Sequence, residues 1–174
     1  MRFACLILIA TLLGCQAAHV SEPLVKTLGT DDAQLDFWHE LASRPVTCND
    51  DAFHGFILYL DQSDPNADYA ARVNALKSRG LLPKNFDRPG DEAVSRGTLA
   101  VAISNALQIK GGMMMQLSPN CARYAVRELI FMDLYPPSTP NQTFSGAEYL
   151  GIIGRIEDYQ RGDATDLPAA QLPQ

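Results

Sequence analysis

Apolar residues recur at three- and four-residue intervals in six segments of the chain, which is the spacing of one helix face. In the first segment Leu35, Trp38 and Leu41 share such a face. Glycine or proline ends most of these segments, and no alternating strand pattern is strong. The sequence therefore predicts an all-α protein with helices over residues 31–43, 49–60, 65–79, 95–109, 119–132 and 145–159.

Three of these helices share a start signature, a hydroxyl residue followed three positions later by a polar one. The hydroxyl oxygen accepts a free backbone N–H and an acid bonds back, and such a cap contributes about 1 kcal/mol. The hydroxyl positions 47, 95 and 145 are near-equally spaced, which indicates an internal repeat. The signatures are Thr47 with Asp50, Ser95 with Thr98 and Ser145 with Glu148, preceded by Val46, Val94 and Phe144.

The six helices group into three helix-loop-helix pairs, each with a loop before its capped second helix. The linkers between pairs are short, so the pairs should pack on one core as a single domain over residues 31–160. Asp64 is expected to cap the third helix, with Pro65 as its first residue and Gly80 as its left-handed stop.

The middle pair resembles a repeat of the S-layer-homology (SLH) family. The best-known motif of that family is Thr-Arg-Ala-Glu at the start of a repeat's second helix, and Ser95-Arg96-Gly97-Thr98 is similar to it. Residues 69–83 resemble the family's first helix and its glycine-containing turn, and residues 124–127, Tyr-Ala-Val-Arg, partly repeat that helix start. The resemblance covers residues 31–160 and is closest in the middle repeat.

The resemblance implies three repeats around a pseudo-threefold axis and binding of a cell-wall polysaccharide. In the family the motif arginine helps to hold the acidic glycan, which implies a ligand role for Arg96, with Arg72 and Arg127 behind it. Cys48 and Gly146 occupy the arginine position in the other two repeats. The alternative for all three arginines is a solvated surface position or a salt bridge between packed repeats.

The N-terminus reads as a bacterial lipoprotein signal over residues 1–14. Arg2 precedes an apolar run of 11 residues, Phe3–Leu13, which is too short to span a bilayer. The run ends in Leu-Leu-Gly-Cys15, so Cys15 is expected to carry diacylglycerol and an amide-linked fatty acid. The alternative is an ordinary signal, cut near Ala17. Residues 15–30 would form a tether, and residues 161–174 a disordered tail.

The chain is acidic, with 14 Lys and Arg against 20 Asp and Glu. This charge disfavours nucleic acid and anionic lipid surfaces as partners, so the membrane would be reached through acyl chains. Gln16 after the lipidated cysteine resembles the pattern that double-membrane bacteria sort to the outer membrane. We therefore expect a cell-envelope protein, in the outer membrane if the host has one.

Export makes a disulfide between Cys48 and Cys121 a candidate, and two separate buried thiols are the alternative. No metal or other cofactor is expected. Met113–Met115 should fill core gaps rather than bind copper, and Asp64 suits a helix cap better than a calcium loop. A metal-dependent enzyme would require His54, Asp50 and Asp51 to converge on one cavity.

The sequence thus favours a non-catalytic envelope lipoprotein whose SLH-like module binds a cell-envelope glycan or a protein partner. The alternatives are a structural or assembly module without a ligand, or an enzyme at His54. No Gly-x-Ser-x-Gly, phosphate-loop or dinucleotide motif occurs in the chain.

Overall fold

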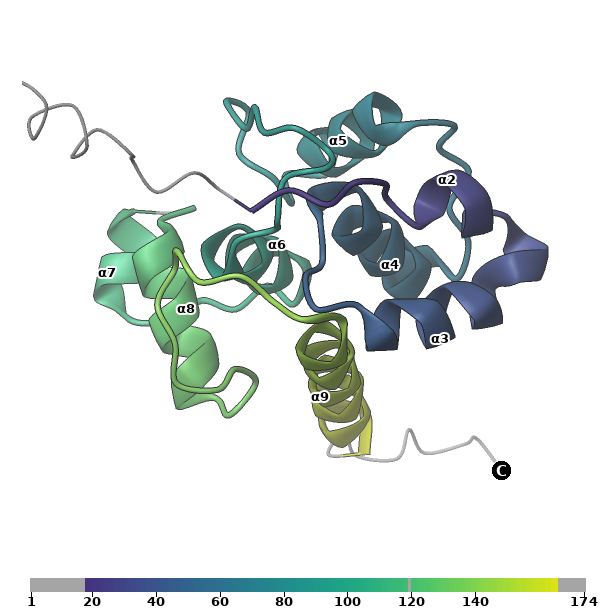
Figure 1. The fold of residues 1–174 in the computed structure, drawn as a ribbon. Coiled ribbons are helices and arrows are strands. Elements are labelled where there is room, and N and C mark those ends of the chain that lie inside the picture. Colours follow the sequence, from purple (N-terminus) through teal and green to yellow (C-terminus); the bar gives the residue numbers. More distant parts are fainter. Residues whose placement is uncertain (1–17, 119, 166–174) are drawn as a thin grey trace, which may run out of the picture.

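The computed structural model describes residues 18–118 and 120–165, and these fold into helices with isolated bridges but no strand (Figure 1). The all-α prediction is therefore confirmed. No helix in the described ranges is long and apolar enough to span a membrane. The elements are α2 (Val25–Leu28), the 3₁₀ turn η2 (Asp31–Ala33), α3 (Gln34–Ser43), α4 (Asn49–Asp61), α5 (Tyr69–Ser78), α6 (Arg96–Ala106), α7 (Met113–Leu117), α8 (Ala122–Phe131) and α9 (Gly146–Thr165).

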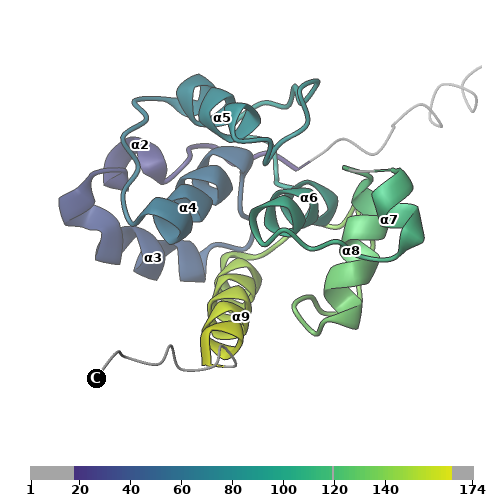
Figure 2. The same ribbon diagram turned by 180° about the vertical axis from the view of Figure 1, so that it is seen from behind.

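The helices pack in a cyclic order rather than as consecutive hairpins. The most extensive packing joins α6 to α8, α3 to α9 and α4 to α5 (Figures 1 and 2). The expected first helices of the three pairs are α3, α5 and α8, and the second helices are α4, α6 and α9. Each first helix therefore packs mainly on the second helix of the preceding pair, and α3 closes the cycle on α9.

The three segments that lead into the second helices meet in the middle of the molecule. The Thr47 N–H donates to the Phe144 carbonyl over 2.9 Å, and the Val94 N–H donates to the Thr47 carbonyl over 3.0 Å. The Arg96 N–H donates to the Gln142 carbonyl over 2.7 Å. These bonds satisfy backbone groups in a region where Val94 and Phe144 are fully buried. The junction fixes where α4, α6 and α9 begin.

One apolar core runs through all three helix pairs. Its largest buried side chains include Phe37 from α3, Phe53 and Phe56 from α4, and Tyr149 from α9. Burial of each large apolar side chain stabilises the fold by about 1.5–3 kcal/mol. The Tyr149 hydroxyl donates to the Ala52 carbonyl over 2.7 Å, so this buried polar group is satisfied and ties α9 to α4.

Two of the three predicted caps are confirmed. Ser95 Oγ accepts the Thr98 N–H over 3.1 Å, and Ser145 Oγ accepts the Glu148 N–H over 3.2 Å. The Glu148 carboxylate also accepts the Ser145 N–H over 2.9 Å, which completes a capping box.

The cap predicted at Thr47 is wrong. Cys48 is the N-cap of α4, and the buried Thr47 hydroxyl has no hydrogen-bond partner within the described residues. The backbone of Thr47 is held in the central junction, one residue too early to cap the helix. Asp50 cannot bond back because its carboxylate accepts from Arg72.

The predicted start of the third helix is wrong as well. Helix α5 begins at Tyr69, and Asp68 caps it by accepting the Ala71 N–H over 2.8 Å. Asp64 is unavailable as a cap because its side chain is buried against His54 and Arg72. Gly80 adopts the expected left-handed conformation after α5, with φ of 70°.

The apolar faces differ from the expectation at both ends of the chain. Leu35, expected inward, is 80% exposed, and Phe37 takes the buried place on α3. Within the expected tether, Leu24 packs into the core and the Val25 N–H donates to Asp51 over 3.0 Å. The packed body therefore begins before residue 31. Helix α9 continues to Thr165, and residues 166–174 lie outside the described ranges.

The methionine run was also expected inside. Met113 and Met114 are instead exposed on the short helix α7, and only Met115 packs partly against the core. Gly111 and Gly112 leave α7 outside the main helix pairs, where it contacts α8.

Candidate functional site

A polar hollow of about 590 Å³ opens beside the central junction. Its walls come from the loop between α5 and α6, the first turns of α4 and α6, and the segment before α9. We call this site the polar hollow. It is lined by Asn49, Pro83, Asn85, Phe86, Asp87, Arg88, Glu92, Ala93, Ser95, Thr98, Asn141 and Thr143.

The loop that forms one wall is fixed by the start of α4. The Asn49 N–H donates to the Glu92 carbonyl over 2.8 Å, and the Asn49 side-chain amide donates to the Pro89 carbonyl over 2.9 Å. The Asp50 N–H donates to the Gly90 carbonyl over 2.9 Å. The free N–H groups of a helix start thus bind the loop carbonyls, which makes the wall a preformed surface.

The chemistry of the lining is that of a polyol site. The lining contains three amides (Asn49, Asn85, Asn141) and three hydroxyls (Ser95, Thr98, Thr143). Phe86, packed edge-on against Phe53 at 5.5 Å, supplies an aromatic ring. The charged groups are Arg88, which donates to Glu92 over 3.1 Å, and Asp87. One cation against two acids gives the hollow no excess positive charge.

A second polar group of residues, buried between α4 and α5, is the buried polar network: Asp50, His54, Asp64, Asn66 and Arg72. Asp64 Oδ2 lies 2.6 Å from His54 Nδ1 and accepts Arg72 Nε over 2.5 Å. Arg72 also donates to Asp50 over 3.0 Å and to the Asn66 carbonyl over 3.1 Å. The network fastens the loop between α4 and α5 to both helices.

The two carboxylates of this network are shifted in opposite directions. Burial alone would raise the pKa of Asp64, but hydrogen bonds from His54, Arg72 and Asn66 outweigh it and hold that pKa well below its usual range. Burial raises the pKa of Asp50, and the Arg72 charge offsets only part of this effect. Asp64 receives hydrogen bonds from His54 and Asn66 as well as from Arg72, and together these lower its pKa, whereas Arg72 does not fully offset burial at Asp50.

The three arginines predicted to bind a ligand have separate surroundings. Arg72 is buried in the network above. Arg96 is buried at the start of α6, where it donates to the Thr143 carbonyl over 3.1 Å and to Glu148 over 2.5 Å. Its guanidinium also lies 4.9 Å from the centre of the Phe144 ring. Arg72 and Arg96 therefore form salt bridges within the fold, which is one of the alternatives stated for these arginines.

Arg127 alone is exposed. It lies on α8 and lines a hollow of about 350 Å³ together with the methionines of α7 and with Phe131. This site is on another part of the molecule from the residues that line the polar hollow.

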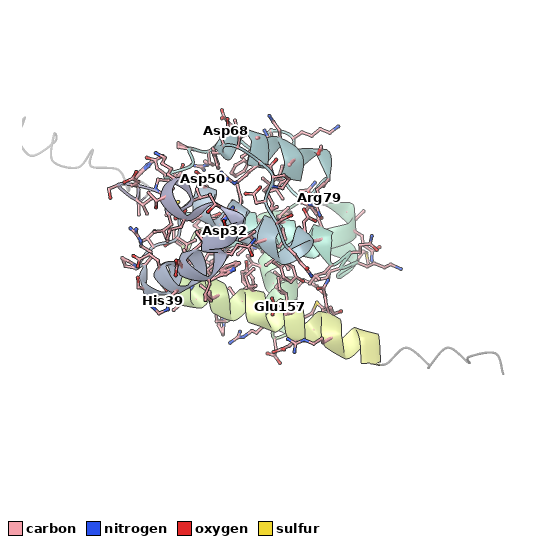
Figure 3. The ribbon with its side chains drawn as sticks, turned by 90° about the vertical axis from the view of Figure 1, so that its right-hand side faces the viewer. Asp32, His39, Asp50, Asp68, Arg79 and Glu157 are labelled. Atoms are coloured by element: carbon pink, nitrogen blue, oxygen red, sulfur yellow. The ribbon has the colours of Figure 1, made fainter. Side chains whose placement is uncertain are left out.

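The residues proposed for a metal-dependent enzyme do not form a metal site. His54 bonds to Asp64, Asp50 to Arg72, and Asp51 to the Val25 N–H. His39, a second histidine that could serve as a metal ligand, lies on α3 and apart from Asp50 (Figure 3). No group of three possible ligands occurs among the side chains that the structure describes.

The cysteines are placed at two helix starts. Cys48 is buried at the N-cap of α4, Cys121 is half-buried at the N-cap of α8, and both are free thiols. Cys15, the predicted lipidation site, lies outside the described residues.

Sequence reasoning missed the polar hollow because its lining comes from four separate segments. The one local signal was the loop over residues 83–92, which is rich in proline, asparagine and charge and lies between two helices. Long loops of this kind carry binding groups more often than the helices that they connect.

Comparison of the chain with protein-family models, with curated proteins and with solved structures finds no match in any of the three. The function therefore has to be argued from the sequence and from the geometry above.

Proposed function

We propose that this protein is a non-catalytic envelope lipoprotein whose SLH-like, three-repeat module binds a neutral glycan in the polar hollow. The observation that carries the ligand class is the lining of that hollow, which combines amide and hydroxyl groups with one aromatic ring. Sugars are recognised by these groups, since their hydroxyls donate and accept hydrogen bonds and their C–H faces pack on aromatic rings.

The cyclic packing supports the three-repeat part of the proposal. The three packed pairs are α3 with α9, α4 with α5 and α6 with α8. In each of them the first helix of one repeat packs on the second helix of the preceding repeat, with the third repeat preceding the first. The segments before α4, α6 and α9 meet through backbone hydrogen bonds, as equivalent parts of three repeats around one axis would. A pseudo-threefold axis through this junction accounts for both observations.

The charges of the site favour a neutral saccharide over the acidic polymer that the family resemblance implies. Arg96 is paired with Glu148, and Arg72 with Asp50 and Asp64. The hollow itself contains two acids and one arginine. An acidic glycan would meet a net negative surface there, which costs binding free energy.

The proposed anchor would keep the hollow close to the membrane. The Ala93 N–H donates to the Ala18 carbonyl over 2.8 Å, and Ala93 lines the hollow. Three chain steps separate Ala18 from Cys15, or about 10 Å of extended backbone. An acylated Cys15 would thus place the ligand at the membrane surface rather than far out in the wall.

Binding to an array of immobilised neutral and acidic oligosaccharides tests the proposal. The double variant Asn85→Ala, Asn141→Ala removes two exposed amides, which come from two different segments of the lining, without touching the core. Loss of two neutral hydrogen bonds should weaken binding to the neutral glycan about tenfold or more. The matched control is Asn74→Ala, an exposed amide on α5 outside the polar hollow, and it should bind like the wild type.

Retention of the neutral glycan by the double variant at the wild-type level would contradict the proposal. Equal absence of binding in the wild type, with all variants folded, would favour the alternative of a structural or assembly module. Mass spectrometry of the mature N-terminus tests the lipid at Cys15 separately.

A further inference from the structure

An apolar patch covers the end of the molecule formed by α7 and α8. Of the five large apolar side chains that the described residues expose, four lie on these two helices: Met113 at 76%, Met114 at 52%, Leu117 at 71% and Phe131 at 85%. Met113, Met114 and Phe131 line the same hollow, so they form one continuous surface. We call these four residues the apolar patch. Contiguous exposed apolar surface of this kind marks an interaction site.

The segment that carries the patch is basic, although the chain as a whole is acidic. Residues 110–131 contain three cations, Lys110, Arg123 and Arg127, and one acid, Glu128, while the whole chain has 14 cations and 20 acids. All three cations are exposed. Glu128 accepts the Gly112 N–H over 3.4 Å, and the next acid, Asp133, follows the end of α8.

The position of the patch suits a flat partner. Helices α7 and α8 lie at one extremity of the molecule in both views (Figures 1 and 2). Large apolar side chains on a projecting end, in a segment that also exposes lysine and arginine, have the composition of elements that insert into the boundary between lipid headgroups and acyl chains.

We propose that the apolar patch inserts into the surface of a bilayer that contains anionic lipids, with Lys110, Arg123 and Arg127 on the phosphates. This membrane contact is separate from the glycan hollow and from any lipid at Cys15. It would orient the body on the membrane through a second point. The overall negative charge of the chain disfavours an anionic surface, but salt screens charges more than about 8–10 Å away, so the residues of the basic segment dominate at the contact.

A tryptophan probe tests the orientation in the full chain. In a Trp38→Phe background, which removes the one natural tryptophan, Phe131→Trp reports on the patch. Leu35→Trp on α3 is the matched control, since Leu35 is the other large apolar residue that the structure exposes, at 80%. Both chains are added to phosphatidylcholine–phosphatidylglycerol vesicles whose acyl chains carry bromine, a contact quencher of tryptophan.

Because interfacial side chains reach about 5–10 Å into the boundary, the Phe131→Trp emission should shift to the blue and lose roughly half of its intensity or more. The Leu35→Trp emission should keep the same intensity with brominated vesicles as with vesicles that carry no bromine. Adding Arg123→Gln and Arg127→Gln to the Phe131→Trp chain should lower the quenching, and added salt should lower it further.

The Arg123→Gln and Arg127→Gln changes separate the patch from anchoring by the N-terminus, because neither residue belongs to that segment. Equal quenching of the two probes, or none for Phe131→Trp, would overturn the proposal. A blue shift of Phe131→Trp that rises with protein concentration in the absence of vesicles would also overturn it, since the patch would then bind a second copy of the chain.

Discussion

At the scale of single residues, the structure shows polar side chains drawn into the interior to fix loops. Asp64 and Arg72 are both buried, and their ion pair must first repay the free energy lost when both charges leave water. The pair is therefore weak evidence for stability. Its clearer effect is geometric, since it closes the loop between α4 and α5 at a defined position.

The ring of His54 completes that closure. Its Nδ1 faces Asp64, while the buried Nε2 has no hydrogen-bond partner among the residues described. The ring packs edge-on against Phe37 with centroids 4.7 Å apart. His54 thus links the network to α3 through an apolar contact.

Cys48 gives a prediction about alkaline pH. Burial, and then the nearby charge of Asp51, raises the pKa of its thiol. Above about pH 9 the unfolded thiol ionises while the folded one keeps its proton, so stability falls by about 1.4 kcal/mol per pH unit. Urea unfolding between about pH 8 and pH 10.5 should show this slope in the wild type and a smaller one in Cys48→Ala.

The matched control is Cys121→Ala, which removes a half-buried thiol and should keep the wild-type slope. Burial also raises the pKa of Tyr135 and Tyr149, and these add a loss of the same sign above about pH 10 in every variant. Identical slopes for Cys48→Ala and the wild type would show that the folded thiol ionises normally.

At the scale of helices, local chemistry was predictable where no distant group competed for it. Ser95 and Ser145 cap their helices as the sequence indicates, because a cap needs only the next turn. Thr47 and Asp64 carry the same local signal, but the central junction holds the Thr47 backbone outside the helix, and Arg72 binds the Asp64 carboxylate. Those contacts span many residues, so no local pattern contains them.

The inward faces of α3 and of the methionine run in α7 were mispredicted for a similar reason. Leu35 and Phe37 both fit a helical period, and the choice between them depends on where α9 and α4 lie. The polar hollow is lined by segments that lie between residue 49 and residue 143, and only the packing of the helices brings these segments together. The fold class could be read from periodicity, whereas the site could not.

The start of α9 shows why residue 146 is a glycine. The Gly146 N–H donates to the Arg44 carbonyl over 2.9 Å, and a Cβ at this residue would overlap the Leu41 carbonyl oxygen. An arginine there would push α9 off the end of α3. The glycine is thus required by the α3–α9 contact.

This contact predicts opposite effects of alanine at two glycines of α9. Gly146→Ala should destabilise the fold by about 3 kcal/mol or more, because backbone must move. Gly151→Ala should stabilise it by about 0.5–1 kcal/mol, since it lies within the helix and a Cβ there meets nothing within 4 Å. Urea midpoints of the two variants measure both effects. A neutral Gly146→Ala would mean that α9 begins elsewhere.

At the scale of the whole molecule, the cycle makes the N-terminal and C-terminal helices depend on each other. Helix α3 packs on α9, and α4 and α6 connect them through the core. In a linear array of hairpins one end could open alone. In a closed cycle, loss of one pairing exposes the apolar faces of helices from two pairs.

Leu41→Ala tests this closure. Leu41 is fully buried on α3, near the end that supports α9. Its truncation should lower the free energy of unfolding by about 2–5 kcal/mol through loss of apolar contact and a residual cavity. If the cycle unfolds as one unit, the slowest-exchanging amides of α4, α6 and α9 should lose the same free energy of protection. Native-state hydrogen exchange of the wild type and the variant measures this change helix by helix. If the amides of α6 and α8 keep their full protection in Leu41→Ala while those of α3 and α9 exchange, the α6–α8 pair is stable independently of the other helices. Closure of the cycle would then not be the cause of cooperative unfolding.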